Sequence, residues 1–187
     1  MAPEARLEST DRGLVPSGEG WFVLNARHAS WRHEEGRSAV CDFEGDSGFP
    51  QIGININVLA PGEPMAMYHW EADQEDFLVL AGEALLIVEG DERPLRQWDF
   101  VHCPAGTNHV IVGAGDSPCA VLAVGARDRI DRPGLGRLHR GRSGAPPRRG
   151  SRTGDERREA GIRGTHQAQA DAVSRRLAAL IGATRGS

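Results

Sequence analysis

Hydrophobic and polar residues alternate in short runs along the first two thirds of the chain. The clearest run covers residues 52–59, and its regularly spaced apolar positions are Ile52, Ile54, Ile56 and Val58. A period of two is the repeat of a β-strand, and it places these four side chains on the same face. The pattern therefore predicts a strand with one buried face.

Other β-prone runs follow at near-regular spacing, separated by turns that contain Gly and Pro. They cover residues 21–25, 39–43, 75–81, 84–89, 94–98, 99–103, 109–112 and 119–124. The pair Gly82-Glu83 between two of these runs predicts a tight hairpin. No strong helical pattern interrupts the series. Short, evenly spaced strands of this kind predict an all-β fold, either an antiparallel sandwich or a barrel, over residues 21–126.

The two ends of the chain have a different composition. Residues 1–20 contain few large apolar side chains and are predicted to form a disordered leader. Residues 127–164 contain 12 Arg, 8 Gly and 3 Pro, which predicts a basic and mostly irregular tail that cannot form a core of its own. Residues 165–187 carry apolar side chains at helical spacing, which predicts a short amphipathic helix.

Charge is distributed unevenly along the chain. The net charge is −4, but residues 1–126 hold 7 Arg against 20 acidic residues, whereas residues 127–187 hold 15 Arg against 6. Phosphate contacts require cations, so we expect no nucleic-acid binding by the first part. Three interpretations of the tail stay open: an arm for nucleic acid or another anionic partner, a solvated linker, and a shift of the coding frame after Ala126.

Targeting signals are missing from the chain as given. The N-terminal residues lack a basic start followed by an apolar run, and no apolar run is long enough to cross a bilayer. The cysteines, Cys41, Cys103 and Cys119, are odd in number and show no paired spacing. We therefore expect a cytoplasmic protein with reduced thiols and no membrane partner.

Candidate metal ligands stand at two points in the strand pattern. His69, Glu71 and Glu75 come just before one apolar run, and His109 comes just before another. The first three are separated by even numbers of residues, so an extended segment directs all three side chains to one face. With His109 from a neighbouring strand, they predict a site for a divalent metal.

These residues also resemble the two sequence motifs of the cupin superfamily. The first motif is matched by Gly62, His69, Glu75 and Gly82, and the second by Pro104, Gly106 and His109. Three positions depart from the family pattern: Glu71 replaces a second His, Trp98 replaces a Gly, and Gly113 replaces an Asn. The resemblance covers about residues 62–113, with compatible strands on either side.

The resemblance implies a small jelly-roll barrel, also called a double-stranded β-helix, with a metal held inside. If Glu71 is a ligand, two His and two carboxylates form an anionic shell that favours Mn²⁺ or Fe²⁺, with Zn²⁺ and Ni²⁺ as the other candidates. If Glu71 stays outside, His69, Glu75 and His109 form a two-His-one-carboxylate triad with open positions for a substrate and O₂.

The function that follows from the sequence is coarse, because cupins carry many chemistries. We expect a barrel that binds a small molecule at the metal, with the metal as a Lewis acid or O₂ activator and Glu71 or Glu75 as acid or base. An oxygenase or an isomerase would use such a site. A non-catalytic ligand-binding or sensor protein is the alternative, and a structural or storage protein is the third. The resemblance also implies a homodimer.

Overall fold

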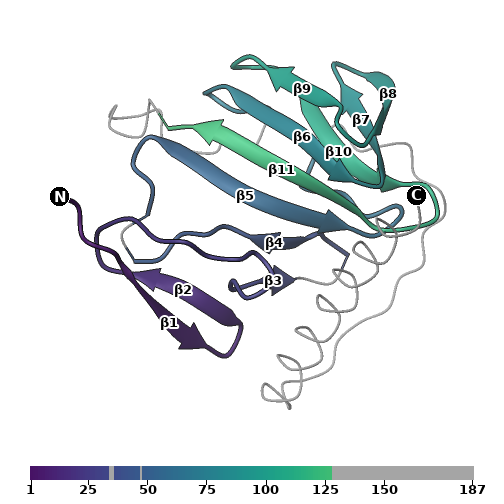
Figure 1. Cartoon of the computed structure of the whole chain (residues 1–187). Helices are drawn as coiled ribbons and strands as arrows, with labels where there is room; N and C mark the ends of the chain where they lie inside the picture. The colour runs from purple at the N-terminus through teal and green to yellow at the C-terminus, as the bar shows by residue number, and fades with distance from the viewer. Residues whose placement is uncertain (34–35, 47, 128–187) are drawn as a thin grey trace, which may run out of the picture.

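The computed structural model describes residues 1–33, 36–46 and 48–127, and this part of the chain is all-β (Figure 1). The strands are β1 (Arg6–Thr10), β2 (Gly13–Ser17), β3 (Arg32–His33), β4 (Ala39–Cys41), β5 (Ile52–Leu59), β6 (Glu75–Ala81), β7 (Glu83–Val88), β8 (Asp91–Arg96), β9 (Phe100–Cys103), β10 (His109–Ala114) and β11 (Cys119–Ala126). The tail predicted over residues 127–164, except its first residue, and the helix predicted over residues 165–187 lie outside the described residues.

Two antiparallel sheets face each other and enclose the core. The larger sheet has the strand order β3-β4-β5-β11-β6-β9, and the smaller has the order β10-β7-β8. Figure 1 shows β5, β11 and β6 side by side in the middle of the larger sheet. The main hydrophobic cluster takes Leu59, Phe77 and Val121 from the larger sheet and Leu86 and Ile111 from the smaller one. This architecture confirms the predicted all-β barrel.

Strand β5 has the predicted bounds, but its faces are used differently from the prediction. The apolar face predicted to lie in the core is exposed at one end, where Ile52 is 44% accessible, and packs at the other end, where Val58 contacts a second cluster around Trp31. Leu59, on the opposite face, belongs to the main core. The prediction of one buried face is wrong, because segments outside the barrel cover part of the outer face as well.

The N-terminal residues form a hairpin, so the prediction of a disordered leader is also wrong. Strands β1 and β2 pair antiparallel from Arg6↔Ser17 to Thr10↔Gly13. Gly13 has a φ of +129°, and a Cβ there would lie 2.2 Å from the Ala29 carbonyl oxygen. Strand β1 is mostly exposed and β2 is half-buried, and the hairpin is held by backbone hydrogen bonds, which leave little trace in the pattern of apolar residues.

Residues 21–25 do not form a strand. The run 21–25, predicted as a strand, contributes only an isolated bridge between Trp21 and Glu4. Among the described residues there is no helix that is long and apolar enough to cross a membrane.

Candidate metal centre

Three of the four candidate ligands meet at one end of the barrel. Glu75 is the first residue of β6, and His109 is the first residue of β10. His69 precedes β6 and forms an isolated antiparallel bridge with His109, closed by hydrogen bonds of 3.2 and 2.8 Å between their backbones. One ligand atom from each of His69, Glu75 and His109 lies within 4.8 Å of the others. The three residues form a group that could hold a metal ion.

Backbone contacts orient both imidazole rings. His69 Nδ1 lies 2.6 Å from the Met67 carbonyl oxygen, and His109 Nδ1 lies 3.0 Å from the Thr107 carbonyl oxygen. A carbonyl oxygen only accepts hydrogen bonds, so each Nδ1 carries the proton when the ring is neutral. Each Nε2 then keeps its lone pair. This is the tautomer that a metal-binding histidine needs, with its second nitrogen fixed by a hydrogen bond.

Two buried acceptor atoms face each other in this group. His109 Nε2 and Glu75 Oε2 are 3.1 Å apart, yet neither has a hydrogen-bond partner. A protonated His109 would form an ion pair with Glu75 at this distance, whereas a neutral His109 has no proton on Nε2 to donate and leaves both atoms without a partner. A buried polar atom without a partner costs about 1–3 kcal/mol. A cation between the two atoms would satisfy both, so the arrangement has the chemistry of a metal site.

Glu71 lies beside the group of three and not within it. Its Oε1 is 3.1 Å from His69 Nε2, and this hydrogen bond to the carboxylate raises the pKa of His69 above its usual value. The backbone of Glu71 is anchored because Gly106 N donates to its carbonyl oxygen at 2.8 Å. The Glu71 carboxylate and a metal would therefore compete for His69 Nε2. The carboxylate contacts this nitrogen through a shared proton, and a bound metal would replace that proton.

The walls around the group are apolar on one side. The Phe77 ring lies 5.3 Å from the His109 ring, measured between centroids. Cys103 pairs with Glu75 across β6 and β9 and is buried. Burial raises the pKa of its thiol to about 11, so it stays protonated at neutral pH and is a small apolar neighbour of the site.

Sequence reasoning missed the polar residues on the inner wall formed by β5, in the same sheet as Glu75. Gly53, Asn55 and Asn57 share the inner face of β5 with Leu59, whereas the isoleucines lie on the outer face. Arg127, just after β11, reaches the same wall. The alternating pattern did contain a signal, because polar and small residues occupied every second position. It could be interpreted only after the strand had been placed in the barrel.

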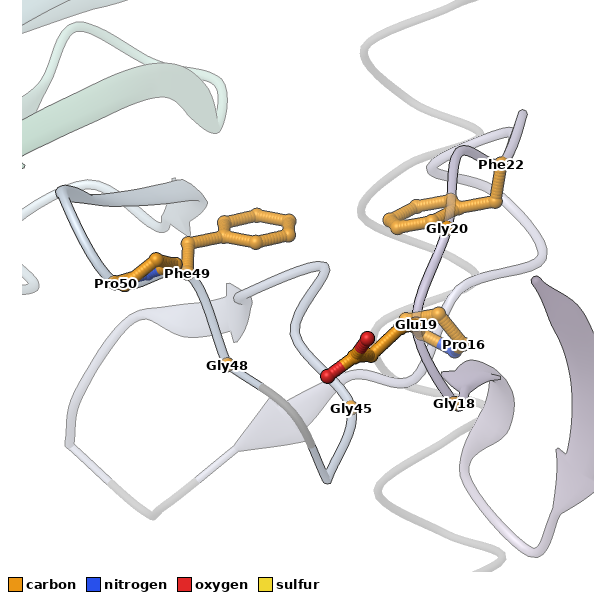
Figure 2. A pocket seen from close by; sticks show the side chains of 9 residues that line it. All are labelled: Pro16, Gly18, Glu19, Gly20, Phe22, Gly45, Gly48, Phe49 and Pro50. Carbon is orange, nitrogen blue, oxygen red and sulfur yellow. The ribbon is translucent and has the colours of Figure 1, made fainter. Parts of the chain in front are cut away.

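A separate cavity lies outside the barrel and contains none of these residues. It has a volume of about 320 Å³ and is lined by the segment after β2 and by the loop before β5. Figure 2 shows the rings of Phe22 and Phe49 entering from opposite sides, with the Glu19 carboxylate between the two segments. The ring centroids are 6.4 Å apart. The metal group and this cavity share no residue.

Comparison with known proteins gives a family match over the barrel. The family model described as Cupin domain matches residues 55–125. No curated protein matches the chain. A predicted oxalate decarboxylase from Thermotoga maritima is 17% identical with a TM-score of 0.51, and the match covers 56% of this chain and 97% of that one. At this identity the similarity shows the fold alone.

Two further solved structures are similar to about half of the chain. A putative sugar phosphate isomerase from Acidithiobacillus ferrooxidans is 26% identical with a TM-score of 0.49, and the match covers 56% of this chain and 74% of that one. A sugar phosphate isomerase from Silicibacter pomeroyi is 29% identical with a TM-score of 0.44, with 48% and 59% covered. The match thus spans less than two thirds of the Silicibacter protein.

Proposed function

The chain belongs to the cupin superfamily through the domain at residues 55–125, and from this premise we propose that it is a metal-dependent enzyme acting on a small molecule inside the barrel. The observation that carries the proposal is the pair of buried acceptors, His109 Nε2 and Glu75 Oε2, which face each other at 3.1 Å without hydrogen-bond partners. A cation between the two atoms would satisfy both of them while His109 is neutral.

His69, Glu75 and His109 would hold the metal. Two imidazoles and one carboxylate suit Mn²⁺ or Fe²⁺, and Zn²⁺ and Ni²⁺ are the other metals to compare. A metal in this shell would act as a Lewis acid on a substrate oxygen or activate O₂. The side chains of His69 and Glu75 are each 23% exposed, so one side of the group is accessible to a substrate.

Glu71 is the chain's own candidate for an acid or base. Its side chain is 34% exposed and its Oε1 stands 3.1 Å from His69 Nε2. Once that nitrogen binds a metal, it has no proton for Glu71, and the carboxylate is free to take a proton from a bound molecule. Phe77 and Cys103 exclude water from the inner side of the group. Glu71 would therefore move a proton while Glu75 serves as a ligand.

Metal content tests this proposal. Mass spectrometry of the full chain, purified without an affinity metal, should find about one equivalent of a divalent transition metal. His69→Ala/His109→Ala should lose it, because both nitrogen ligands are gone. His102→Ala is a matched control, since His102 lies on the outer face, 2.6 Å from Asp76 Oδ1. Wild-type protein that holds no metal and takes none up on titration would refute the proposal.

We also propose that the protein pairs as a homodimer through the outer face of the larger sheet. Phe100 on β9 is 64% exposed and Ile52 on β5 is 44% exposed, and both side chains lie on that face. Phe100 shares a row on this face with the half-buried Leu78 and Leu122, and apolar side chains grouped on an exposed sheet are typical of protein–protein contacts. The cytoplasmic location stays a prediction from the sequence.

A further inference from the structure

The inner wall beside Glu75 lacks side chains on two successive strands. Glu75 on β6 pairs with Gly125 on β11, and Gly125 pairs with Gly53 on β5. A Cβ at Gly125 would lie 3.6 Å from Glu75 Oε1. Neighbouring strands are about 4.8 Å apart, so backbone alone lines this row for about 10 Å from the carboxylate. The two glycines keep the row clear of side chains between the metal group and β5.

Arg127 stands at the far end of this row. Its guanidinium lies over Gly53, with Nη2 at 3.0 Å and Nε at 3.3 Å from the position that a Cβ would take. Nη1 and Nη2 donate to the two carboxylate oxygens of Glu44 at 3.2 and 2.6 Å, and Nη1 also donates to the Phe49 carbonyl oxygen at 2.6 Å. These three bonds fix the plane of the guanidinium.

The hydrogen bonds to Glu44 and Phe49 do not use the side edge of the same guanidinium. Its N–H groups, on Nε and Nη2, have no acceptor among the residues that the structure describes. A planar pair of N–H groups of this kind binds both oxygens of a carboxylate or phosphate at once. Glu44 occupies the end edge, so it acts as a positioning residue that presents the side edge.

Asn55 supplies a further donor two residues from Gly53 on the same inner face. The Ser38 hydroxyl donates to Asn57 Oδ1 at 3.0 Å, a shorter contact than its 3.4 Å to the Met65 carbonyl oxygen. Asn57 Nδ2 in turn donates to Asn55 Oδ1. Ser38 and Asn57 are 3% and 4% exposed, so this chain of bonds is fixed in the interior. It engages the Asn55 oxygen and leaves the Asn55 Nδ2 group to donate elsewhere.

We infer that Arg127 and Asn55 form an oxyanion subsite on the wall of β5 and β11. It would bind a carboxylate or phosphate group of the small molecule whose other end reaches His69, Glu75 and His109; this second half of the inference rests on the proposed function. The guanidinium edge and the Asn55 Nδ2 group both offer N–H donors, which select an acceptor, and the positive charge of Arg127 favours an anionic one. The substrate class is therefore a small oxyanion-bearing molecule.

Isothermal titration of the full chain tests the subsite, with inorganic phosphate and succinate as probes and with the protein both metal-free and Mn²⁺-loaded. Wild-type protein should bind one probe or both, and the stronger probe identifies the oxyanion. Arg127→Ala and Asn55→Asp should each weaken binding at least tenfold, and Arg127→Lys should fall between, because it keeps the charge but lacks the planar pair. Arg93→Ala, an exposed arginine on β8, is the matched control and should bind as wild type does.

The variants also separate this inference from the proposed function. Arg127→Ala and Asn55→Asp should retain the wild-type metal content. Equal affinity of wild type and both variants for the probes, or no binding of either probe by wild type, would overturn the subsite even in a protein that binds metal. Oxyanion binding in a protein that takes up no metal would support the subsite and refute the metal site. If Arg127→Ala does not fold, Asn55→Asp decides, because it breaks no ion pair.

Discussion

His109 has three structural features that favour metal binding. It is only 2% exposed, its Nδ1 is held by the Thr107 carbonyl oxygen, and its Nε2 faces Glu75 Oε2 without a partner. Each feature alone is common for a core histidine. Together they direct Nε2 at a carboxylate, and in the neutral ring this nitrogen is an acceptor that a cation between the two groups would stabilise.

Glu75→Gln should therefore have opposite effects on the metal-free and metal-bound protein. The amide can donate to His109 Nε2, so the metal-free variant should gain about 1 kcal/mol in free energy of unfolding, or a few degrees in Tm. The rise in Tm that Mn²⁺ gives the wild type should disappear. Thermal melts with EDTA and with Mn²⁺ measure both effects. A less stable metal-free variant that still responds to Mn²⁺ would show that Glu75 is not a ligand.

The three thiols should be unreactive in the folded protein. Burial raises the pKa values of Cys41, Cys103 and Cys119 to about 11, so at pH 8 only about one thiol in a thousand is the reactive thiolate. A thiol reagent such as DTNB should label none of them in native protein at pH 8 and all three in guanidinium. The thiolate fraction grows tenfold per pH unit, so labelling should speed up toward pH 10. Fast labelling at pH 8 would mean that the barrel opens readily.

At the residue scale, the sequence located the candidate metal group, whose ligands stay a prediction, but not the polar residues of the β5 wall. Even spacing in an extended segment places His69, Glu71 and Glu75 on one face, and that reasoning does not reveal which carboxylate reaches the group. Arg127 and Glu44 are 83 residues apart and meet only through the pairing of β11 with β5. Such a contact depends on strand register, which a sequence pattern does not determine.

At the scale of one element, β5 shows what an alternating pattern can and cannot predict. The period of two located the strand at residues 52–59, but it did not identify the inner face. The isoleucine face was the natural choice because it is the more apolar one. In the barrel that face turns outward, and Asn55 and Asn57 face the interior, where Ser38 satisfies the buried amide. On β5 the polar residues Asn55 and Asn57 face the interior, which reverses the usual rule that apolar residues lie inside.

Two substitutions on that outer face should differ sharply. Val58 is fully buried against the cluster around Trp31, so Val58→Ala should lower the free energy of unfolding by about 2 kcal/mol. Ile52 is 44% exposed, so Ile52→Ala should cost less than about 0.5 kcal/mol. Urea unfolding at constant m-value measures both. Equal losses would indicate a uniformly buried face, as the sequence pattern alone predicted.

At the scale of the whole molecule, the larger sheet carries Glu75 and the proposed oxyanion subsite on the same inner face, and the smaller sheet contributes His109. The sequence predicted the barrel because its strands are short, regular and separated by clear turns. It did not predict the β1–β2 hairpin, whose strands depend on backbone pairing and on the close approach of Gly13 to Ala29. Hydrophobic periodicity predicts strands poorly where they do not contribute a face to a core.

The proposed dimer should depend on the exposed aromatic residue of the outer sheet face. Phe100→Glu places a charge on that face, so it should convert a dimer into a monomer without loss of Tm greater than a few degrees, because Phe100 is 64% exposed within one chain. Light scattering coupled to size exclusion gives the mass of each form. Val23→Glu, at an exposed position in the N-terminal segment, is the control. A wild-type monomer would contradict the dimer and leave the metal site unaffected.

The most direct test of the central claim is pulsed electron paramagnetic resonance of the Mn²⁺-loaded full chain, which detects the nitrogens bound to the metal. We expect coupling to two histidine nitrogens in wild type and in His102→Ala, and to one in His109→Ala. This result would establish His69 and His109 as ligands of one ion. Bound Mn²⁺ without nitrogen coupling, or with coupling unchanged in His109→Ala, would contradict a metal centre built on His69, Glu75 and His109.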